Sequence, residues 1–207
     1  MYLFARTRRI NPAQARAAMA LAMEAAQRAS DITGLPIRLW TPVMSGQMNV
    51  MVWTGNAEHL VDFEVAGDKL GESNEFNDWV EQNDSLFVGP FEDAVLHVLH
   101  GAAAEEAPAY VLGTQAVPAN GAYAEAFGIG VEIAQTAEQI TGLPMLFGSW
   151  LTGTFGGVGW VAGAPDLDAV ETANAALAAN DDWIKLIERA GHAFREGGTS
   201  TLYRRLN

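Results

Sequence analysis

The sequence predicts an α+β protein in which two tandem copies of a β-α-β-β-α-β motif pair their antiparallel sheets into one α/β barrel. The pentapeptide ITGLP occurs at Ile32–Pro36 and again at Ile140–Pro144, so its two occurrences are separated by about half of the chain. The same order of strand and helix patterns surrounds both occurrences. The strands are almost continuously apolar, as in Val50–Trp53, which is typical of a sheet that is covered on both faces.

The repeat extends well beyond the pentapeptide. We assign residues 1–103 to the first copy, residues 108–207 to the second copy, and the small acidic segment 104–107 to a linker. Two copies of so long a period indicate a duplicated domain, because a solenoid needs three or more short repeats. When the two copies are aligned on the pentapeptide, like residues coincide: Tyr2 with Tyr110, Glu24 with Glu132, and, after the loss of one residue, Trp53 with Trp160.

The first strand and helix of each copy carry clear end signals. Tyr2–Thr7 and Tyr110–Gln115 are short and rich in aromatic and β-branched residues, which predicts strands. Asn11 precedes a proline at the expected first helical position, and Gly34 ends the pattern, so a helix is expected between them. The segment 119–142 ends on the same Gly-x-Pro sequence. ITGLP is therefore interpreted as a helix C-terminus and the entry to the next strand.

A hairpin, a second helix and a closing strand complete each copy. Residues 37–44 and 48–55 predict two strands around a Ser-Gly-Gln turn, and residues 145–153 and 155–163 predict their counterparts. Asn56 and Asp166 are expected to begin the second helices, each followed by a short helical turn that contains Trp79 or Trp183. Residues 94–101 and 200–207 predict the closing strands.

The composition is that of a globular protein, with 49% hydrophobic and 18% charged residues. The formal net charge of −13 would repel nucleic acids and anionic membranes, and we interpret the one basic cluster, Arg6–Arg9, as a solvated strand edge. The absence of cysteine suits a reducing cytoplasm. Neither a signal peptide nor a membrane-spanning run is expected.

The duplicated pattern resembles the dimeric α/β-barrel superfamily, in which two ferredoxin-like halves pair their sheets. Within it, the pattern is similar to the NIPSNAP-type domain in the segments SGQMNVMVW, LAANDDWIKLI at Leu177–Ile187 and NEFNDWVEQ at Asn74–Gln82. The resemblance implies the ferredoxin-like barrel. Relatives in the superfamily include cofactor-independent monooxygenases, haem-degrading enzymes, chlorite dismutase-like proteins and muconolactone isomerases, so the fold does not choose among these activities.

The histidines predict no metal site and no cofactor. His97 and His100 are three positions apart on an expected strand, so their rings would point to opposite faces unless a bulge intervened. No haem-binding pattern surrounds any of the four histidines. His97 and Tyr203 occupy equivalent positions on the closing strands. They are either satisfied, half-buried polar residues or a proton acceptor and a hydrogen-bond donor at a ligand.

Aromatic residues without a counterpart in the other copy are the better pocket candidates. Trp40 and Trp150 have no aromatic match, and together with Arg38 and Asn49 we predict them to bind a ligand. The glycine-rich segment Gly153–Gly163 lacks the spacing of a dinucleotide-binding loop. Its glycines more plausibly make room for close packing or for a ligand against the backbone. We expect the more open pocket in the first copy, where the first helix is rich in alanine.

Two functions are compatible with these patterns. The first is an enzyme acting on a small hydrophobic or aromatic molecule, as a cofactor-independent monooxygenase or an isomerase-like catalyst, with His97 or Tyr203 handling a proton. The second is a non-catalytic barrel that binds a hydrophobic ligand or serves as an assembly module. The duplication would supply in one chain the pairing that relatives obtain by dimerising, so either a monomer or a homodimer is expected.

Overall fold

A computed structural model describes residues 1–46, 49–104 and 106–207. Gln47 and Met48, at the predicted hairpin turn, and Glu105, in the predicted linker, lie outside the described residues. The strands are Tyr2–Ile10 (β1), Arg38–Pro42 (β2), Val50–Ala57 (β3), Phe87–His100 (β4), Tyr110–Ala116 (β5), Met145–Trp150 (β6), Val158–Ala164 (β7) and Thr199–Arg205 (β8). The α-helices are Ala15–Thr33 (α1), Leu60–Glu72 (α2), Asn74–Gln82 (α3), Tyr123–Thr141 (α4), Leu167–Ala178 (α5) and Asp181–Ala190 (α6).

The predicted fold class is confirmed. The element order is β-α-β-β-α-α-β in each sequence copy, with a short 3-10 helix before α1 and another before β4. The strands are hydrogen-bonded in the order β1-β3-β2-β8-β5-β7-β6-β4, which closes as a barrel, and the registered pairs are antiparallel. The division of the sequence into residues 1–103 and 108–207 stays a prediction.

The chain divides into two compact units. The first unit comprises Met1–Val95 and Arg204–Asn207, and the second comprises Leu96–Tyr203. The limits of these units differ from those of the sequence copies because β4 and β8 each contribute one part to one unit and the remainder to the other.

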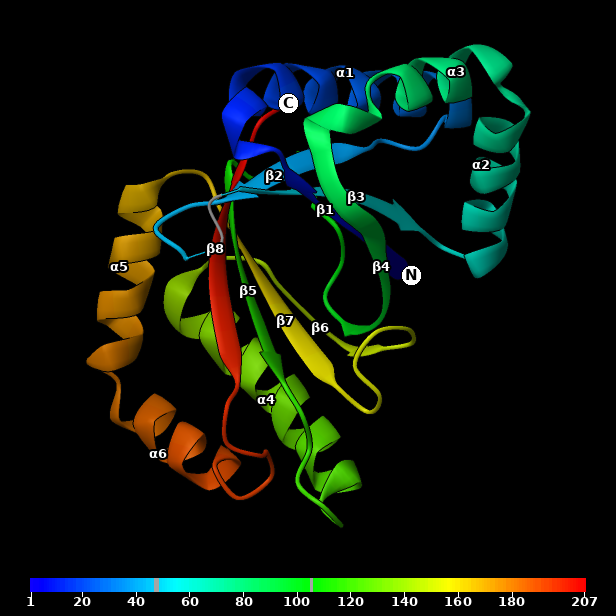
Figure 1. Cartoon of the computed structure of the whole chain (residues 1–207). Coiled ribbons are helices and arrows are strands. Elements are labelled where there is room, and N and C mark those ends of the chain that lie inside the picture. The colour runs from blue at the N-terminus through cyan, green and yellow to red at the C-terminus, as the bar shows by residue number, and fades with distance from the viewer. Residues whose placement is uncertain (47–48, 105) are drawn as a thin grey trace. The chain divides into compact units, whose positions relative to one another are not determined.

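In the first unit, α1 covers one face of β1, β2 and β3 (Figure 1). Ala18, Ala22 and Ala26 are completely buried there and pack with Leu39 and Met51. The small side chains therefore let the helix lie close to the sheet. Trp53 packs against this core, and its indole Nε1 donates to the carbonyl oxygen of Ala22 at 3.1 Å.

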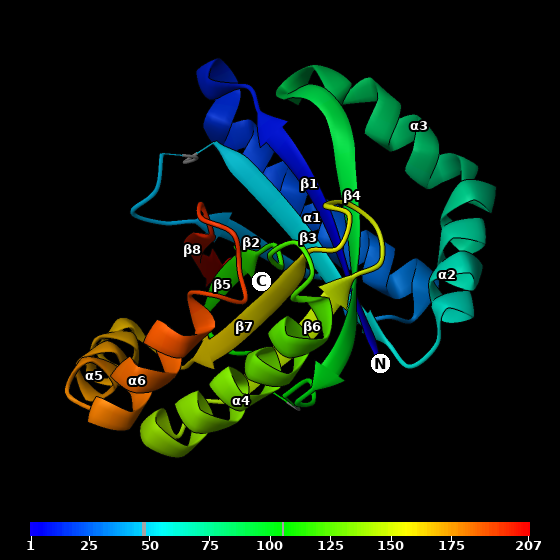
Figure 2. The ribbon, with the colours of Figure 1, turned by 90° about the horizontal axis from the view of Figure 1, so that it is seen from below.

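In the second unit, α4 crosses β5, β7 and β6 on one face (Figure 2). Phe147, Val158 and Trp160 pack against this helix, and Trp160 Nε1 donates to the carbonyl oxygen of Gly130 at 2.9 Å. Gly130 is the counterpart of Ala22 in the sequence repeat, as Trp160 is of Trp53. The same tryptophan-to-helix hydrogen bond is thus present in both copies, and both tryptophans belong to the core, as expected.

The ITGLP segments form the predicted junction. Gly34 and Gly142 adopt left-handed conformations with φ of 79° and 69° and cap α1 and α4. Thr33 Oγ1 donates to the carbonyl oxygen of Ala29 and accepts from the backbone N–H of Leu35. The second copy reproduces both bonds with the equivalent residues: Thr141, Ala137 and Leu143. The repeated threonine and glycine therefore satisfy backbone groups at the helix end.

Two details differ from the expectation, and a third agrees with it. Asn56 does not begin the second helix, because β3 continues to Ala57 and His59 is the N-cap residue of α2. Asp166 does cap α5, with Oδ1 accepting from the backbone N–H of Ala169 at 2.7 Å. The helical turns around Trp79 and Trp183 are the complete helices α3 and α6.

The basic cluster is not simply a solvated edge. The Arg8 side chain is only 7% exposed, lies over the rings of Phe87 and Phe91, and pairs with Asp84 at 2.5 Å. Arg6 forms a two-pronged hydrogen bond with Asp93 at 2.8 and 2.7 Å, which raises the pKa of the guanidinium. Both arginines therefore stabilise the first unit.

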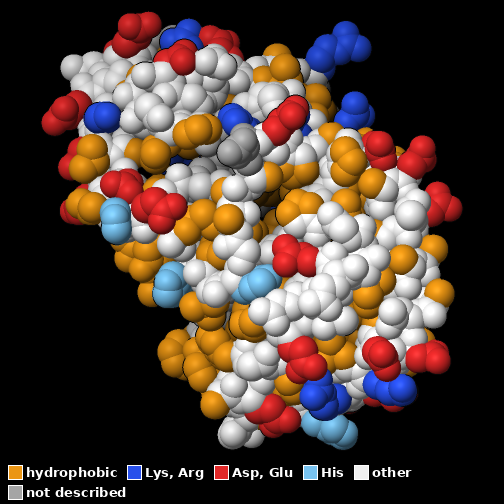
Figure 3. Space-filling model, turned by 180° about the vertical axis from the view of Figure 1, so that it is seen from behind, with side chains coloured by type: hydrophobic (Ala, Val, Ile, Leu, Met, Phe, Trp, Pro, Cys, Tyr) orange, Lys and Arg blue, Asp and Glu red, His pale blue; other side chains and the backbone are white. Residues whose placement is uncertain are grey.

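Charged side chains are scattered over the face that Figure 3 shows, with acidic residues interspersed among hydrophobic ones. Among the described residues, no helix combines the length and the apolar character needed to cross a membrane.

Candidate functional site

The sheet of the second unit has a face that α4 does not cover. Phe147, Val158 and Trp160 point toward α4, so the alternate residues of the same strands point to the other side. We call this opposite side the Trp150 face. Its larger side chains are those of Leu96, Gln115, Leu146, Trp150, Val161 and Tyr203.

Trp150 lies against glycine backbone on this face. A Cβ atom placed on Gly157 would be 3.1 Å from Trp150 Cδ1, and one placed on Gly159 would be 3.4 Å from Trp150 Cζ2. The glycine-rich segment therefore makes room for an indole of the same chain, which is the close-packing alternative considered for it. A side chain at Gly157 would displace either Trp150 or the following loop.

The indole N–H of Trp150 is the most unusual polar group of the second unit. Its Nε1 atom is buried and has no hydrogen-bond partner among the residues that the structure describes. A buried donor left unpaired costs about 1–3 kcal/mol, so such groups normally have a partner, either in the protein or in a bound molecule. The atom therefore marks a position where an acceptor from outside the chain would be stabilised.

Tyr203 lies on the same face as Trp150. Its ring approaches Gly113, where a Cβ atom would be 3.5 Å from Tyr203 Cε2. Burial raises the pKa of the Tyr203 hydroxyl, and a side-chain hydrogen bond with Thr201 partly offsets this effect. The phenol is therefore neutral at ordinary pH and retains a proton that it can donate.

Strands β4 to β7 of the second unit bring no charged side chain to the Trp150 face. Their residues that pair on this side are apolar, glycine or glutamine. A charged ligand would lose its hydration here without gaining an opposite charge from these strands. The face is therefore suited to a neutral molecule.

His97 does not share this face. It pairs with Ser149 of β6, whereas its neighbour Leu96 pairs with Trp150, so the His97 side chain is on the α4 side of the sheet. Its proposed role as a proton acceptor stays a prediction, and a ligand held by Trp150 would lie on the other side of the sheet.

A bulge changes the expected relation between His97 and His100. The register of β4 shifts between Val98 and His100, so His100 pairs with Phe147 and lies on the same side as His97. Simple alternation of side chains along the strand does not predict this bulge. Among the described residues, no group of three histidine, cysteine, aspartate or glutamate side chains is arranged to hold a metal ion.

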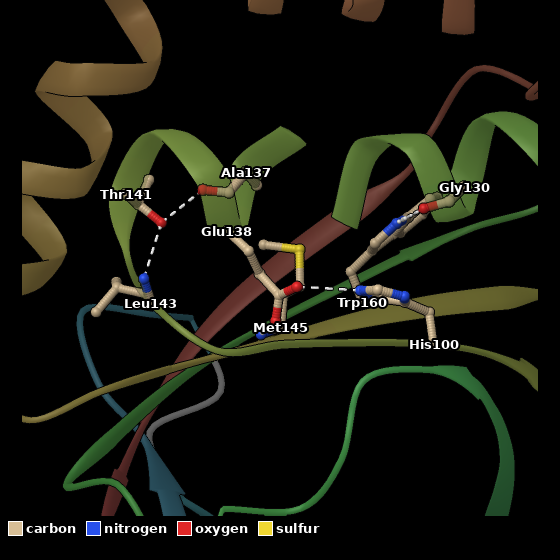
Figure 4. Close-up of polar contacts among 8 residues, drawn as sticks. All are labelled: His100, Gly130, Ala137, Glu138, Thr141, Leu143, Met145 and Trp160. Carbon is tan, nitrogen blue, oxygen red and sulfur yellow. Dashed lines mark hydrogen bonds and ion pairs between the residues drawn. The ribbon is translucent and has the colours of Figure 1, made fainter. Parts of the chain in front are cut away.

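His100 instead contacts a carboxylate. Its Nε2 atom is 3.1 Å from Glu138 Oε2, and Glu138 Oε1 accepts from the backbone N–H of Met145 at 2.8 Å (Figure 4). At the equivalent positions of the first copy, Ser30 Oγ accepts from the N–H of Ile37. The exchange of serine for glutamate beside the repeated pentapeptide is the sequence signal that would have pointed to this pair.

The predicted ligand-binding residues of the first unit are spread along its β2–β3 pair, in which Arg38 is opposite Thr54 and Trp40 is opposite Val52. Arg38 and Trp40 are alternate residues of β2 and share the face away from α1, while Asn49 precedes β3 and its carbonyl oxygen accepts from the N–H of Ile10. Trp40 is 6% exposed, and its Nε1 donates to Thr54 Oγ1 at 2.8 Å. Because this indole already has its partner, it has less reason than Trp150 to bind a ligand atom.

A shallow surface depression of about 280 Å³ lies between α4 and α6. Its charged side chains neutralise one another, since Arg189 pairs with Glu132 and Lys185 with Asp182. It therefore offers little unpaired polarity to a ligand.

Solved structures share this fold. A proposed monooxygenase from Fusobacterium nucleatum superposes with a TM-score of 0.75 over 100% of this chain and 92% of its own, at 9% identity. An anthrone oxidase-like protein matches with a TM-score of 0.67 over 100% and 91% of the two chains, at 13% identity. At such identities the likeness establishes the fold, the ferredoxin-like α/β barrel that the sequence predicts, and no activity.

The match to a NIPSNAP domain covers less of the chain. A NIPSNAP domain protein from Burkholderia xenovorans matches 47% of this chain and 93% of its own at 17% identity, with a TM-score of 0.38. No protein-family model matches the sequence, and no curated protein sequence matches it.

Proposed function

We propose that the protein binds a small, neutral, largely hydrophobic molecule on the Trp150 face. The observation that carries the proposal is the buried Nε1 of Trp150, which has no partner among the described residues. An indole N–H only donates, so the ligand must offer an acceptor such as a carbonyl or phenolic oxygen. The uncharged surroundings favour a molecule whose remaining surface is apolar.

Tyr203 supplies a second polar contact in this proposal. Its neutral hydroxyl can donate to an oxygen of the ligand, while Leu146 and Val161 contact the apolar part. A few fixed polar groups within an apolar surface are the usual composition of a small-molecule site.

The test uses anthrone, a flat neutral ketone, as the probe, with binding measured by isothermal titration calorimetry. Trp150→Phe keeps a ring over Gly157 and Gly159 but removes the donor, so the Kd should rise about 5- to 10-fold, equivalent to about 1 kcal/mol. Trp79→Phe, which changes an indole in α3 of the first unit, is the matched control and should bind as the unaltered protein does. Equal affinity of Trp150→Phe and the unaltered protein would contradict the proposed role of Nε1.

A second proposal is oxidation of the bound molecule by dioxygen without a cofactor. It is supported by the shared fold with a proposed monooxygenase and an anthrone oxidase-like protein. A methylene group and O₂ give a carbonyl group and water, so the four electrons balance without an external reductant. Tyr203 would stabilise, by a hydrogen bond, the oxygen anion that forms when solvent takes a proton from the methylene, and this proton is returned in the water that is produced.

An oxygen electrode distinguishes the enzyme from the binder. If the protein is an oxidase, anthrone should be consumed with one O₂ per molecule, and Tyr203→Phe should lower kcat about 10- to 100-fold with a smaller change in KM. Binding of anthrone with oxygen uptake no faster than in buffer would leave the ligand-binding function and exclude this reaction.

A further inference from the structure

The loop that follows Trp150 exposes large apolar side chains to solvent. Phe155 is completely exposed and Leu151 is 55% exposed, although the flanking strands are well covered. A single exposed apolar residue needs no explanation. A fully exposed phenylalanine in the loop that follows Trp150, however, could cover the apolar part of a ligand.

The base of this loop is fixed to the Trp150 face. The backbone N–H of Trp150 donates to the carbonyl oxygen of Gly157 at 2.9 Å, and the N–H of Gly157 donates to that of Thr154 at 3.0 Å. A Cβ atom on Gly157 would touch both Trp150 Cδ1 and Thr154 O at 3.1 Å. The loop therefore begins and ends against the indole that bears the unpaired N–H.

The tip of the loop has two points of backbone freedom. Gly153 and Gly156 have φ of 96° and 70°, values that other residues rarely adopt, and they enclose Thr154 and Phe155. Hinges of active-site loops are short segments that absorb such backbone changes, and they are often built from small residues.

We propose that the loop Leu151–Gly157 is the second wall of the ligand site and closes over a molecule bound at Trp150. Closure moves Phe155 from solvent onto the apolar part of the ligand, so the ligand gains a cover and the phenylalanine loses its exposure. This inference rests on the proposed binding function and adds to it the residue that controls how long the ligand stays bound.

The experiment exploits the absence of cysteine from the chain. Thr154→Cys places a single thiol on the exposed tip beside Phe155, and its rate of modification by a disulfide reagent is measured with and without anthrone. Closure should slow the modification about ten-fold or more. Val65→Cys, at an exposed apolar position of α2, is the control and should react at one rate in both conditions.

A second variant assigns the effect to Phe155. In Thr154→Cys combined with Phe155→Ala the protection should disappear, and Phe155→Ala alone should raise the dissociation rate of anthrone about ten-fold, as expected for the loss of a buried aromatic contact. If calorimetry shows anthrone bound while Thr154→Cys reacts unchanged, the loop is not a wall and the binding function stands. If anthrone does not bind the unaltered protein, both proposals fail.

Discussion

At the scale of single residues, four indoles of this chain differ in whether the indole N–H has a hydrogen-bond partner. Trp53 and Trp160 donate to helix carbonyls, and Trp40 donates to Thr54. The N–H of Trp150, by contrast, has no partner among the described residues. A bound molecule or a water would recover the stability that this unpaired donor costs.

The raised pKa of Tyr203 predicts a distinct dependence of stability on pH. Burial disfavours the phenolate, so the folded pKa lies above the unfolded value of about 10. The contribution of the neutral phenol to stability is fully present below the unfolded pKa and is lost as pH rises through the folded pKa. The free energy of unfolding should therefore fall more steeply above about pH 10 in the unaltered protein than in Tyr203→Phe.

Urea denaturation at several pH values between about 8 and 11.5 measures this difference. Tyr123→Phe, which changes a 54% exposed tyrosine at the start of α4, is the control and should follow the unaltered protein. Parallel curves for Tyr203→Phe and the unaltered protein would show that the hydroxyl is not held in a desolvated position.

The sequence identified Trp150 and Tyr203 as candidates, but not their relation to His97. The alternation of side chains along a strand predicts which residues share a face of that strand. It does not state the register between β4 and β6, which pairs Leu96, and not His97, with Trp150. The choice of face for His97 is therefore a property of strand pairing, which a single sequence does not reveal.

At the scale of elements, the junction at ITGLP was predictable because its chemistry is local. A left-handed glycine and a threonine that caps its own helix need only neighbouring residues. The bulge at Val98–His100 was not predictable, since it depends on close contact with another strand: a Cβ atom on Gly148 would lie 2.3 Å from the carbonyl oxygen of His97. This glycine lets β4 and β6 approach each other.

Glu138 replaces the serine that stands at the equivalent position, Ser30, of the first copy. We predict that its bond to the N–H of Met145 and its contact with His100 contribute separately to stability. Glu138→Ser should retain an acceptor for the N–H of Met145, as Ser30 does for Ile37, and lose only the contact with His100. The expected cost is below about 1 kcal/mol, because the pair is partly exposed to solvent. Glu138→Ala leaves the Met145 N–H without this acceptor and should cost about 1 kcal/mol more.

The measurement is the free energy of unfolding in urea at pH 7 for the unaltered protein, Glu138→Ser and Glu138→Ala. The unaltered protein should be the most stable, followed by Glu138→Ser and then Glu138→Ala, while Glu125→Ala in the first turn of α4 provides a control for removal of a carboxylate from that helix. If Glu138→Ser and Glu138→Ala were equally stable, the serine would not have taken over the bond to Met145.

At the scale of the whole chain, the predicted duplication would account for the repeated order of elements, but not for the way in which the chain divides into compact units. The end of β4 belongs to the second unit and the last residues of the chain belong to the first. Repeated sequence patterns describe each copy by itself. The division of β4 and β8 between the units depends on pairing between segments far apart in sequence, which a repeated pattern does not reveal.

The final residues therefore have a structural role that their position in the sequence does not suggest. Asn207 Oδ1 accepts from the N–H of Leu39 at 2.7 Å, and its Nδ2 donates to the carbonyl oxygen of Ile37 at 3.0 Å. Leu39 is completely buried, and Leu206 packs against the core of the first unit. Asn207 thus satisfies two backbone groups at the start of β2.

Asn207→Ala should lower the free energy of unfolding by about 1–3 kcal/mol, because it leaves both backbone groups without these side-chain partners. The matched control is Asn174→Ala on the exposed side of α5, where alanine is the better helix former and stability should be unchanged or slightly higher. Hydrogen exchange then locates the effect: Asn207→Ala should accelerate exchange at the N–H of Leu39 and its neighbours in β2 and leave β6 unchanged. Exchange accelerated equally in β2 and β6 would mean that the asparagine stabilises the whole chain, and that the last residues do not belong specifically to the first unit.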